Sequence, residues 1–296
     1  MKHVFVINPT AGKGIDSVSL QMKIKNACES KNLDYEVFLT DSKGSGEKFV
    51  REFCARGEPA RFYACGGDGT LREVTNGAYG AENVSVGCIP LGTGNDFVKA
   101  FKKHDFNNIE TALTATEKKI DLLLINEKSY CINLCNIGFD ADVAHNVSRF
   151  KRFFSGILAY NFSVFYCLVG KISRTMEIHI DGEILKGEFL LCACGNGNAY
   201  GGGYISAPLA QVDDGLIDVC ILKKVSKLKF INLINVYKAG MHLIEPSLKD
   251  VITYKKCKRI TLAFPKETIF CMDGEIEHAK TVDIQILPKA LTFLVP

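Results

Sequence analysis

Three glycine-rich segments could bind phosphate, and each follows a short apolar run in the first hundred residues. Glycine takes backbone conformations with positive φ and lets successive N–H groups approach an anion closely. A helix that begins directly after such a loop adds the positive end of its dipole. Each loop alone is a common turn sequence, but the three loops together predict a phosphate-binding rim. The segments are Asn8-Pro9-Thr10-Ala11-Gly12-Lys13-Gly14, Gly66-Gly67-Asp68-Gly69-Thr70 and Leu91-Gly92-Thr93-Gly94-Asn95-Asp96.

These loops match neither of two familiar nucleotide-binding motifs. Lys13 is followed by Gly14, so the Walker pattern GK[ST] is missing. The dinucleotide fingerprint GxGxxG does not follow the first apolar run. The glycine loops therefore indicate phosphate without naming the nucleotide.

The elements that must position the loops alternate between strand and helix over the first 120 residues. This rhythm predicts a mostly parallel sheet with helices on both faces, and ligands of such sheets bind beyond the carboxyl ends of the strands. Strand-like runs cover 4–7, 35–39, 61–65 and 84–89, and helical spacing covers 18–30, 47–56, 71–78, 97–102 and 107–116.

After about residue 120 the chain consists of short β-rich runs separated by Gly, Asn and Asp. Many short strands predict a sandwich or barrel-like second domain, with the boundary near 120–126. The runs are 122–126, 130–134, 176–180, 188–194, 216–222, 260–264, 268–272, 282–287 and 290–295, with helical segments at 153–170 and 226–242.

Composition limits the class of protein. The 296 residues are 47% hydrophobic and 23% charged, which excludes a disordered or fibrous chain. The near balance of 36 Lys and Arg with 33 Asp and Glu argues against a dedicated nucleic-acid binder, so we expect no nucleic-acid partner. Twelve cysteines without CxxC pairs, and no secretory signal at the start, predict reduced thiols in a cytoplasmic protein.

Taken together, the motifs resemble the diacylglycerol kinase catalytic domain, and most closely the bacterial soluble lipid kinases of that family. The resemblance spans nearly the whole chain, in order. GGDGT alone would be shared with NAD kinases, whereas the full set is more specific. The matching segments are NPTAGKG at 8–14, GGDGTLREVTNG at 66–77, PLGTGNDF at 90–97, NIGFDADV at 136–143, GNGNAYGGGYISAPLAQVDDGLIDV at 195–219 and MDGE at 272–275.

The resemblance implies an α/β plus all-β fold: a nucleotide domain over 1–122, joined by a C-terminal strand at 290–296, and a β-sandwich lipid-substrate domain over 123–289. ATP is expected in the cleft between them. Asp68, an acid in a phosphate loop, is expected to act through Mg²⁺ or metal-bound water, with a plain turn residue as the alternative. Glu73 and Asn76, on the next helix, are expected to orient that loop. The nucleotide residues implied are Asn8, Pro9, Thr10, Ala11, Gly12, Thr40, Gly66, Gly67, Asp68, Gly69, Thr70, Leu71, Arg72 and Thr93.

The resemblance also implies roles for two acidic clusters. A structural Mg²⁺ would be held by Gln211, Asp214 and Leu216, the first and last through main-chain oxygens, which suits a hard cation. Asp273 or Glu275 would accept the proton of the acceptor hydroxyl, and the sequence leaves the two open. For both clusters a tight Asp-Gly turn is the alternative, and at Gln211–Leu216 the turn and the site can coincide.

A lipid acceptor would require contact with a membrane surface. At about 1.5 Å per residue the uncharged stretch 153–170 reaches roughly 27 Å, slightly less than a bilayer core, so we expect no transmembrane span. Arg149-Phe150-Lys151-Arg152-Phe153-Phe154 places cations among aromatics directly before this helix, which favours peripheral attachment at the inner face of the membrane. A core helix with solvated cations is the alternative.

The leading expectation is an ATP- and Mg²⁺-dependent kinase that phosphorylates a lipid hydroxyl, with diacylglycerol giving phosphatidic acid in phospholipid metabolism. A sphingoid base or another glycerolipid remains open as the acceptor. An NAD kinase would carry an Asn-Glu pair, and Asn126-Glu127 stands outside a matching context. A nucleotide-binding regulator without turnover is the remaining alternative. The resemblance also offers a homodimer as an assembly.

Overall fold

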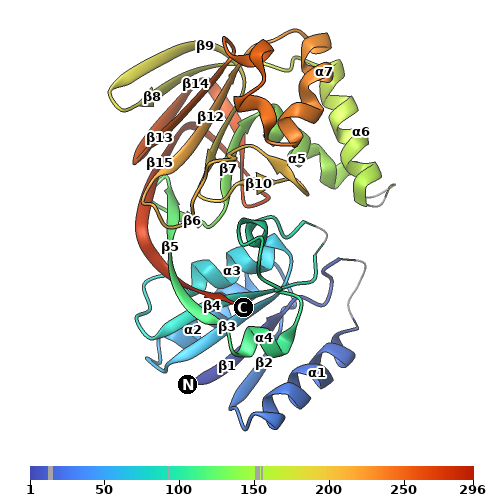
Figure 1. The fold of residues 1–296 in the computed structure, drawn as a ribbon, viewed down its shortest axis with the longest axis vertical. Helices are drawn as coiled ribbons and strands as arrows, with labels where there is room; N and C mark the ends of the chain where they lie inside the picture. Colours follow the sequence, from blue (N-terminus) through green and yellow to red (C-terminus); the bar gives the residue numbers. More distant parts are fainter. Residues whose placement is uncertain (13–15, 93, 151–153, 155) are drawn as a thin grey trace. The chain divides into compact units, whose positions relative to one another are not determined.

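The chain forms two compact units in a computed structural model that describes residues 1–12, 16–92, 94–150, 154 and 156–296 (Figure 1). The α/β unit comprises Met1–Leu122 and Pro288–Pro296. The β-rich unit comprises Leu123–Leu287. Two strands, β5 (Thr116–Ile125) and β15 (Glu275–Val295), run through the boundaries between them.

The α/β unit is built on a sheet of strand order β15-β4-β3-β1-β2. These neighbours pair in parallel, and the end of β15 joins β4 through Phe293 and Val86. In the sheet, β1 has β2 on one side and β3 on the other, so the direction in which strands are added reverses between β1 and β3. The four strands that come first in the chain are β1 (Lys2–Ile7), β2 (Tyr35–Leu39), β3 (Ala60–Gly66) and β4 (Val84–Pro90).

The residues that cap two helices of this unit explain where those helices begin. Asp16 caps α1 by accepting the Ser19 N–H at 3.0 Å, and α1 buries Leu20 and Ile24 in an apolar cluster with β1. Helix α3 starts three residues before the predicted Leu71, because the extended Gly67 caps it and the loop passes directly into its first turn. The helices are α1 (Ser17–Ser30), α2 (Ser45–Cys54), α3 (Asp68–Ala78) and α4 (Ile109–Leu113), with a 3₁₀ turn, η1 (Phe97–Ala100).

The β-rich unit contains longer strands than its sequence predicts. The runs predicted at 260–264 and 268–272 form one strand, β14, whose register shifts between Ala263 and Thr268. Those predicted at 282–287 and 290–295 likewise belong to β15. The strands, besides β5 and β15, are β6 (Ser129–Cys131), β7 (Leu134–Gly138), β8 (Arg174–Ile180), β9 (Glu183–Gly195), β10 (Ala199–Tyr200), β11 (Tyr204–Ile205), β12 (Ile217–Lys223), β13 (Ile252–Cys257) and β14 (Arg259–Met272).

The helices of the β-rich unit lie together at one side of it (Figure 1). Helix α5 is absent from the sequence prediction, although Phe139 and Val143 repeat at helical spacing and pack into an apolar cluster with β9 and β12. None of the helices within the described ranges is both long and apolar enough to cross a membrane. The elements are α5 (Phe139–Phe150), α6 (Gly156–Val169), α7 (Lys227–Lys238), η2 (Met241–Leu243) and η3 (Pro246–Leu248).

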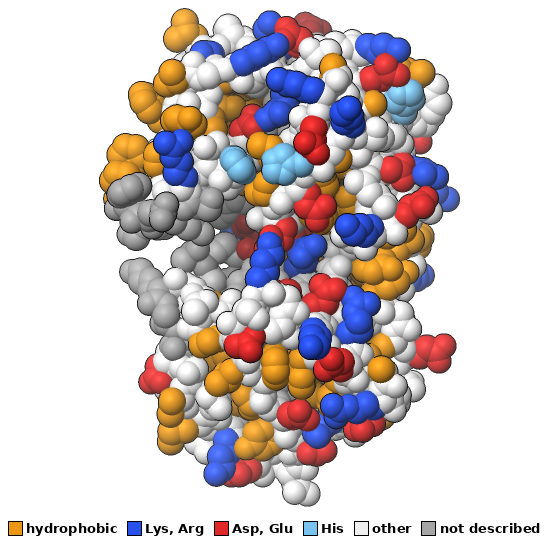
Figure 2. All heavy atoms as spheres, turned by 180° about the vertical axis from the view of Figure 1, so that it is seen from behind, with side chains coloured by type: hydrophobic (Ala, Val, Ile, Leu, Met, Phe, Trp, Pro, Cys, Tyr) orange, Lys and Arg blue, Asp and Glu red, His pale blue; other side chains and the backbone are white. Residues whose placement is uncertain are grey.

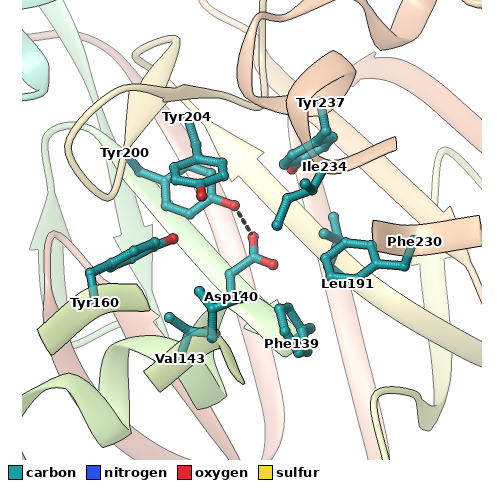
Figure 3. Close-up of a pocket in the computed structure, with 11 residues that line it drawn as sticks. Phe139, Asp140, Val143, Tyr160, Leu191, Tyr200, Tyr204, Phe230, Ile234 and Tyr237 are labelled. Carbon is teal, nitrogen blue, oxygen red and sulfur yellow. Dashed lines mark hydrogen bonds between the residues drawn. The ribbon is translucent and has the colours of Figure 1, made fainter. Parts of the chain in front are cut away.

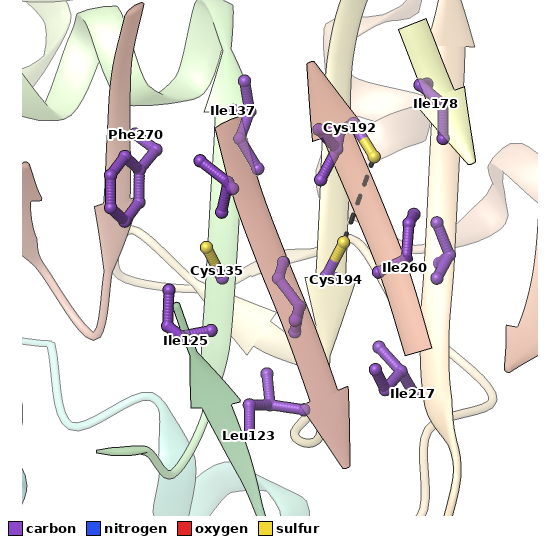
Figure 4. Close-up of a cluster of buried hydrophobic side chains, with 14 of the residues drawn as sticks. Leu123, Ile125, Cys135, Ile137, Ile178, Cys192, Cys194, Ile217, Ile260 and Phe270 are labelled. Carbon is purple, nitrogen blue, oxygen red and sulfur yellow. Dashed lines mark hydrogen bonds between the residues drawn. The ribbon is translucent and has the colours of Figure 1, made fainter. Parts of the chain in front are cut away.

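The core of the β-rich unit includes several cysteines among aliphatic side chains (Figure 4). Cys135, Cys192 and Cys194 are fully buried there, beside residues such as Ile137 and Ile217. All twelve cysteines are free thiols. Burial raises the pKa of the Cys135 thiol well above its ordinary value, so it packs as a small apolar group.

Candidate functional site

Four loops lie at one edge of the α/β sheet. Strands β1 to β4 are parallel, with Ile7 opposite Leu39 and Cys65, and Gly66 opposite Pro90. The loops that follow these strands therefore emerge at the same carboxyl edge. They flank the point where strand order reverses, which is where open α/β sheets bind their ligands.

The first loop is shaped by Asn8. Its Oδ1 atom accepts the backbone N–H of Thr10 at 3.0 Å and the Thr10 hydroxyl at 2.8 Å. Its own N–H bonds to the carbonyl of Cys65 on β3 at 3.0 Å. Gly12 has φ of +66°, and a Cβ there would lie 2.6 Å from the Leu91 oxygen, so glycine is required where the first loop meets the third.

Asp68 joins the second loop to the third. Its Oδ2 atom accepts the N–H of Asn95 at 2.9 Å and its Oδ1 atom accepts the N–H of Asp96 at 2.8 Å. A Cβ at Gly94 would lie 2.7 Å from Asp68 Oδ2, so a larger residue there would displace the Asp68 carboxylate. Asp68 therefore organises the rim directly, and its expected role through Mg²⁺ stays a prediction. Thr93 lies outside the described residues.

Glu73 holds a different loop from the one that the sequence predicts. Its two carboxylate oxygens accept the N–H groups of Gly44 at 2.8 Å and Gly46 at 3.0 Å, at the start of α2. The loop after β2 is thereby fixed, with Thr40 bonded through its N–H to the carbonyl of Ile7 at 2.9 Å. The expectation that Glu73 orients the Gly66–Thr70 loop is wrong, because both oxygens of its carboxylate are engaged by the loop after β2.

The Asp273-Gly274 pair forms a tight hairpin turn between β14 and β15. Both residues have positive φ, +48° and +86°, as a type I′ turn requires. Asp273 is 7% exposed, and its carboxylate accepts backbone N–H groups of Ile132 at 2.8 Å, Asn133 at 3.0 Å and Leu134 at 3.2 Å. It is thus built into the 131–134 loop. Glu275, the first residue of β15, is only half-buried.

Two asparagines that the sequence analysis missed attach the glycine-rich 195–203 segment to the same loop. Asn196 donates from Nδ2 to the Ile132 carbonyl at 2.8 Å. Asn133 donates from Nδ2 to the Ala199 carbonyl at 2.9 Å. Both lie within matched or adjacent motifs, but their partners are more than 60 residues away in sequence, so no local pattern could indicate these bonds.

The expected Mg²⁺ ligands Gln211, Asp214 and Leu216 do not fit a divalent-cation site. Asp214 Oδ1 accepts the N–H of Leu216 at 3.0 Å, and Asp214 Oδ2 lies 2.6 Å from the ammonium group of Lys256. The single carboxylate of the set is therefore already engaged by a cation. Across the described part of the chain, no cluster of three or more His, Cys, Asp or Glu side chains could hold a metal ion.

A small aromatic cavity lies among α5, α6, α7 and the β10–β11 pair (Figure 3). Asp140 points into it, is 8% exposed and accepts the Tyr200 hydroxyl at 2.5 Å. Burial raises the pKa of Asp140 to about 7, against the opposing effect of the Tyr200 hydrogen bond. The cavity measures about 20 Å³, room for about one water, so it is too small for an acyl chain.

The helical side of the β-rich unit exposes apolar side chains among cations (Figure 2). The segments 143–176 and 219–244 together hold ten Lys and Arg and not one Asp or Glu, in a chain with 36 and 33 overall. Phe154 stacks on Phe162 at 4.2 Å and Arg149 lies over Tyr166 at 5.6 Å. The predicted patch residues 151–153 lie outside the described ranges. The exposed apolar residues of α6 are Leu158, Phe162, Phe165, Tyr166 and Val169, and those of α7 are Leu228 and Ile231.

The Asn126-Glu127 pair, which an NAD kinase would use in its dinucleotide site, forms a turn between β5 and β6. Both residues have positive φ, and Asn126 Oδ1 accepts the N–H of Asp283 at 2.8 Å. The pair therefore serves the fold of the β-rich unit, which weakens the NAD kinase alternative.

Comparison with known proteins agrees with this architecture. Residues 2–125 match the diacylglycerol kinase catalytic domain, and residues 133–295 match the YegS C-terminal NAD kinase beta sandwich-like domain. A diacylglycerol kinase of Bacillus subtilis is 28% identical over 280 residues, 93% of this chain and 90% of that protein. One from Staphylococcus carnosus is 26% identical over 91% of this chain and 87% of its own length. A solved structure from Bacillus anthracis, described as a putative diacylglycerol kinase, covers all of this chain and 95% of its own, with TM-score 0.79 and 25% identity.

The chain therefore belongs to the family of diacylglycerol kinases and YegS-like lipid kinases. It is a lipid kinase, a phosphotransferase, and membership of a kinase family implies the use of ATP. The predicted fold class, an α/β domain followed by a β-sandwich-like domain, is confirmed.

Proposed function

We propose that this lipid kinase transfers the γ-phosphate of MgATP to the hydroxyl group of diacylglycerol, giving phosphatidic acid. The observation that carries the proposal is the rim of four loops at the carboxyl edge of the α/β sheet, in which Asp68 joins the Gly66–Thr70 loop to the 91–96 loop. Backbone N–H groups at the start of α3 favour phosphate there. Mg²⁺ enters as part of the nucleotide substrate, and the expected nucleotide residues in 8–12, 40, 66–72 and 93 form its proposed site. The acceptor assignment draws on relatives named diacylglycerol kinase.

Glu275 is the proposed base. Phosphoryl transfer to an alcohol requires a group that accepts the hydroxyl proton as the bond to phosphorus forms. Asp273 already accepts three backbone N–H groups and the thiol of Cys131 at 3.2 Å, which assigns it to the loop. The type I′ turn fixes the backbone direction of β15 and thereby positions Glu275. We therefore assign proton acceptance to Glu275 and positioning to Asp273.

Access to a membrane-borne acceptor is proposed to occur through the exposed face of α6 and the start of α7. Apolar side chains such as Phe165, 68% exposed, would enter the interface, and the surrounding cations would face anionic headgroups. Attachment would be peripheral, at the inner face of the cytoplasmic membrane. A homodimer stays a prediction from the resemblance alone.

The acceptor is tested by radiolabel transfer from ATP to vesicles that contain diacylglycerol, a sphingoid base, ceramide or a monoacylglycerol. We expect label in phosphatidic acid. Gly94→Ala should reduce transfer, because its Cβ would displace Asp68 Oδ2 and disturb the junction of the two loops. Label in another lipid alone would show that this lipid, and not diacylglycerol, is the acceptor. Absence of label from every lipid would refute the proposed phosphate transfer.

Membrane attachment is tested by co-sedimentation with vesicles that contain phosphatidylglycerol. Phe165→Ser/Val169→Ser should weaken binding by about tenfold through the loss of apolar contact. Ile184→Ser is a matched control, because Ile184 is 53% exposed on β9, outside the cationic segments. Equal weakening by both changes would remove the α6 face from the proposal.

A further inference from the structure

The ammonium group of Lys256 is surrounded by three oxygen atoms. Its Nζ lies 2.6 Å from Asp214 Oδ2 and 3.1 Å from Asp218 Oδ2. It also donates to the backbone oxygen of Leu209 at 3.4 Å. Two carboxylates and a carbonyl are the ligand types that a protein offers to a hard cation.

The sheet fixes this arrangement. Strands β12 and β13 are antiparallel, with Asp218 directly opposite Lys256. Tyr254, two residues before Lys256 and on the same face, donates its hydroxyl to Asp218 Oδ1 at 2.6 Å. The same hydroxyl accepts the N–H of Leu209 at 3.4 Å. Both backbone groups of Leu209 are thus held by side chains of β13, which attaches the segment before β12 to the sheet.

The charges require a counter-ion at this position. The Asp218 side chain is 1% exposed, and its buried Oδ2 atom faces Lys256 Nζ at 3.1 Å. Asp214, with 20% of its side chain exposed, contributes a second negative charge. Without Lys256, a buried carboxylate would lose its neighbouring positive charge, which is strongly unfavourable.

We propose that Lys256 is a built-in counter-cation that takes the structural role expected of Mg²⁺ at Asp214, so that the fold of residues 209–218 needs no divalent ion. A divalent ion at Asp214 Oδ2 would meet the like charge of the ammonium group, and Asp214 Oδ1 is engaged by Leu216. Lys256 would thus act on folding and ion binding, independently of the proposed phosphoryl transfer.

The first test is thermal unfolding of the wild-type protein, without nucleotide, in EDTA and in millimolar MgCl₂. The expected result is the same Tm in both. A Tm several degrees higher in MgCl₂ would show that the wild-type fold gains stability from a divalent ion and would overturn the inference.

The second test is Lys256→Met, which retains length and removes the charge. We expect a lower Tm in EDTA, partial recovery in MgCl₂, and Tb³⁺ binding at least about tenfold tighter than in the wild type, detected by Tyr-sensitised luminescence. Lys255→Met is the matched control, since Lys255 directly precedes Lys256 in the sequence and pairs with Glu183 at 2.6 Å on the surface. It should create no ion dependence. A Lys256→Met protein as stable as the wild type in EDTA would contradict the inference.

A double variant keeps the test decisive if Lys256→Met does not fold. Lys256→Met/Asp218→Asn removes the buried negative charge together with its counter-ion, while the new amide oxygen can still accept the Tyr254 hydroxyl. This protein should be more stable in EDTA than the single variant and indifferent to MgCl₂. A double variant that is no more stable than the single one would refute the role of Lys256.

Discussion

Two Asp-Gly turns of the β-rich unit share a sequence pattern but satisfy their carboxylates in opposite ways. The carboxylate of Asp273, 7% exposed, accepts three backbone N–H groups. The carboxylate of Asp214 lies nearer the surface and pairs with the ammonium group of Lys256. Oriented backbone dipoles stabilise the charge of Asp273, whereas the charge of Asp214 meets one backbone N–H, that of Leu216, and an opposite charge.

This difference separates two functions of the same dipeptide. Oriented backbone dipoles are part of the fold and hold the 131–134 loop against the β14–β15 turn, which positions Glu275. An ion pair instead attaches one strand to a neighbouring segment, and solvent and salt can weaken it. The partner of the carboxylate, which the dipeptide does not specify, therefore decides the role of each turn.

The largest expected effect comes from truncating the two aspartates. Asp273→Ala should lower the free energy of unfolding by on the order of 3–5 kcal/mol, because three buried N–H groups lose a charged acceptor and alanine disfavours positive φ. Asp214→Ala should cost about 1 kcal/mol because its pair is partly exposed. Urea unfolding of both variants checks this. Equal losses would show that the two turns do not differ as described.

Asp140 extends the comparison to a buried carboxyl group that accepts a hydrogen bond from the Tyr200 hydroxyl. Its folded pKa, raised to about 7 chiefly by burial, exceeds the usual value of 3.8. Stability that is present below the unfolded pKa should therefore be lost as pH rises towards 7. Asp140→Asn removes this dependence and should stabilise the protein by on the order of 1–4 kcal/mol at pH 8, with little change near pH 4.

Unfolding of wild type and Asp140→Asn between pH 4 and 8 measures this effect. The two curves should separate as the pH rises. A constant difference across the range would contradict a buried, neutral carboxyl group. Tyr200→Phe, which removes the hydroxyl that Asp140 accepts, is the control for loss of the hydrogen bond alone.

Asp68 resembles Asp273 in that its carboxylate also accepts backbone N–H groups. It accepts two of them, and it lies closer to the surface than Asp273. Asp68→Ala should cost about 1–3 kcal/mol and speed amide hydrogen exchange at Asn95 and Asp96. Hydrogen exchange with mass spectrometry measures this locally. Unchanged exchange in the 91–97 peptide would show that Asp68 does not hold the third loop.

Salt gives the smallest expected difference. In 1 M NaCl the cost of Asp214→Ala should fall by a few tenths of a kcal/mol, because salt screens its pair with Lys256. The cost of Asp273→Ala should stay constant because buried dipoles are little screened. Urea titrations at low and high NaCl measure both variants. A larger salt response for Asp273→Ala would reverse the comparison.

The sequence predicts the α/β unit well because its signals are local. Apolar runs that end in glycine loops correctly place the rim at the carboxyl ends of β1, β3 and β4. The bond between Asp68 and Asn95, 27 residues apart, has no local signal. Glu73 was misassigned for the same reason, since its partners at Gly44 and Gly46 precede it by almost 30 residues.

The β-rich unit is predicted less well because long-range pairing decides its details. The Asp273-Gly274 sequence correctly indicates a turn, but the three N–H groups come from residues about 140 positions earlier. Lys256 lies 42 residues after Asp214, and only the register of β12 with β13 brings them together. A residue outside the motif therefore engages the one carboxylate of the expected Mg²⁺ site.

The most direct test of the account measures kcat for phosphate transfer to diacylglycerol beside the free energy of unfolding, in Glu275→Gln and Asp273→Asn. Glu275→Gln should reduce kcat by about 10²–10⁴-fold with unchanged unfolding. Asp273→Asn should lower stability, because the amide offers one acceptor oxygen in place of two. A Glu275→Gln enzyme with wild-type kcat would contradict the assignment of Glu275 as the base.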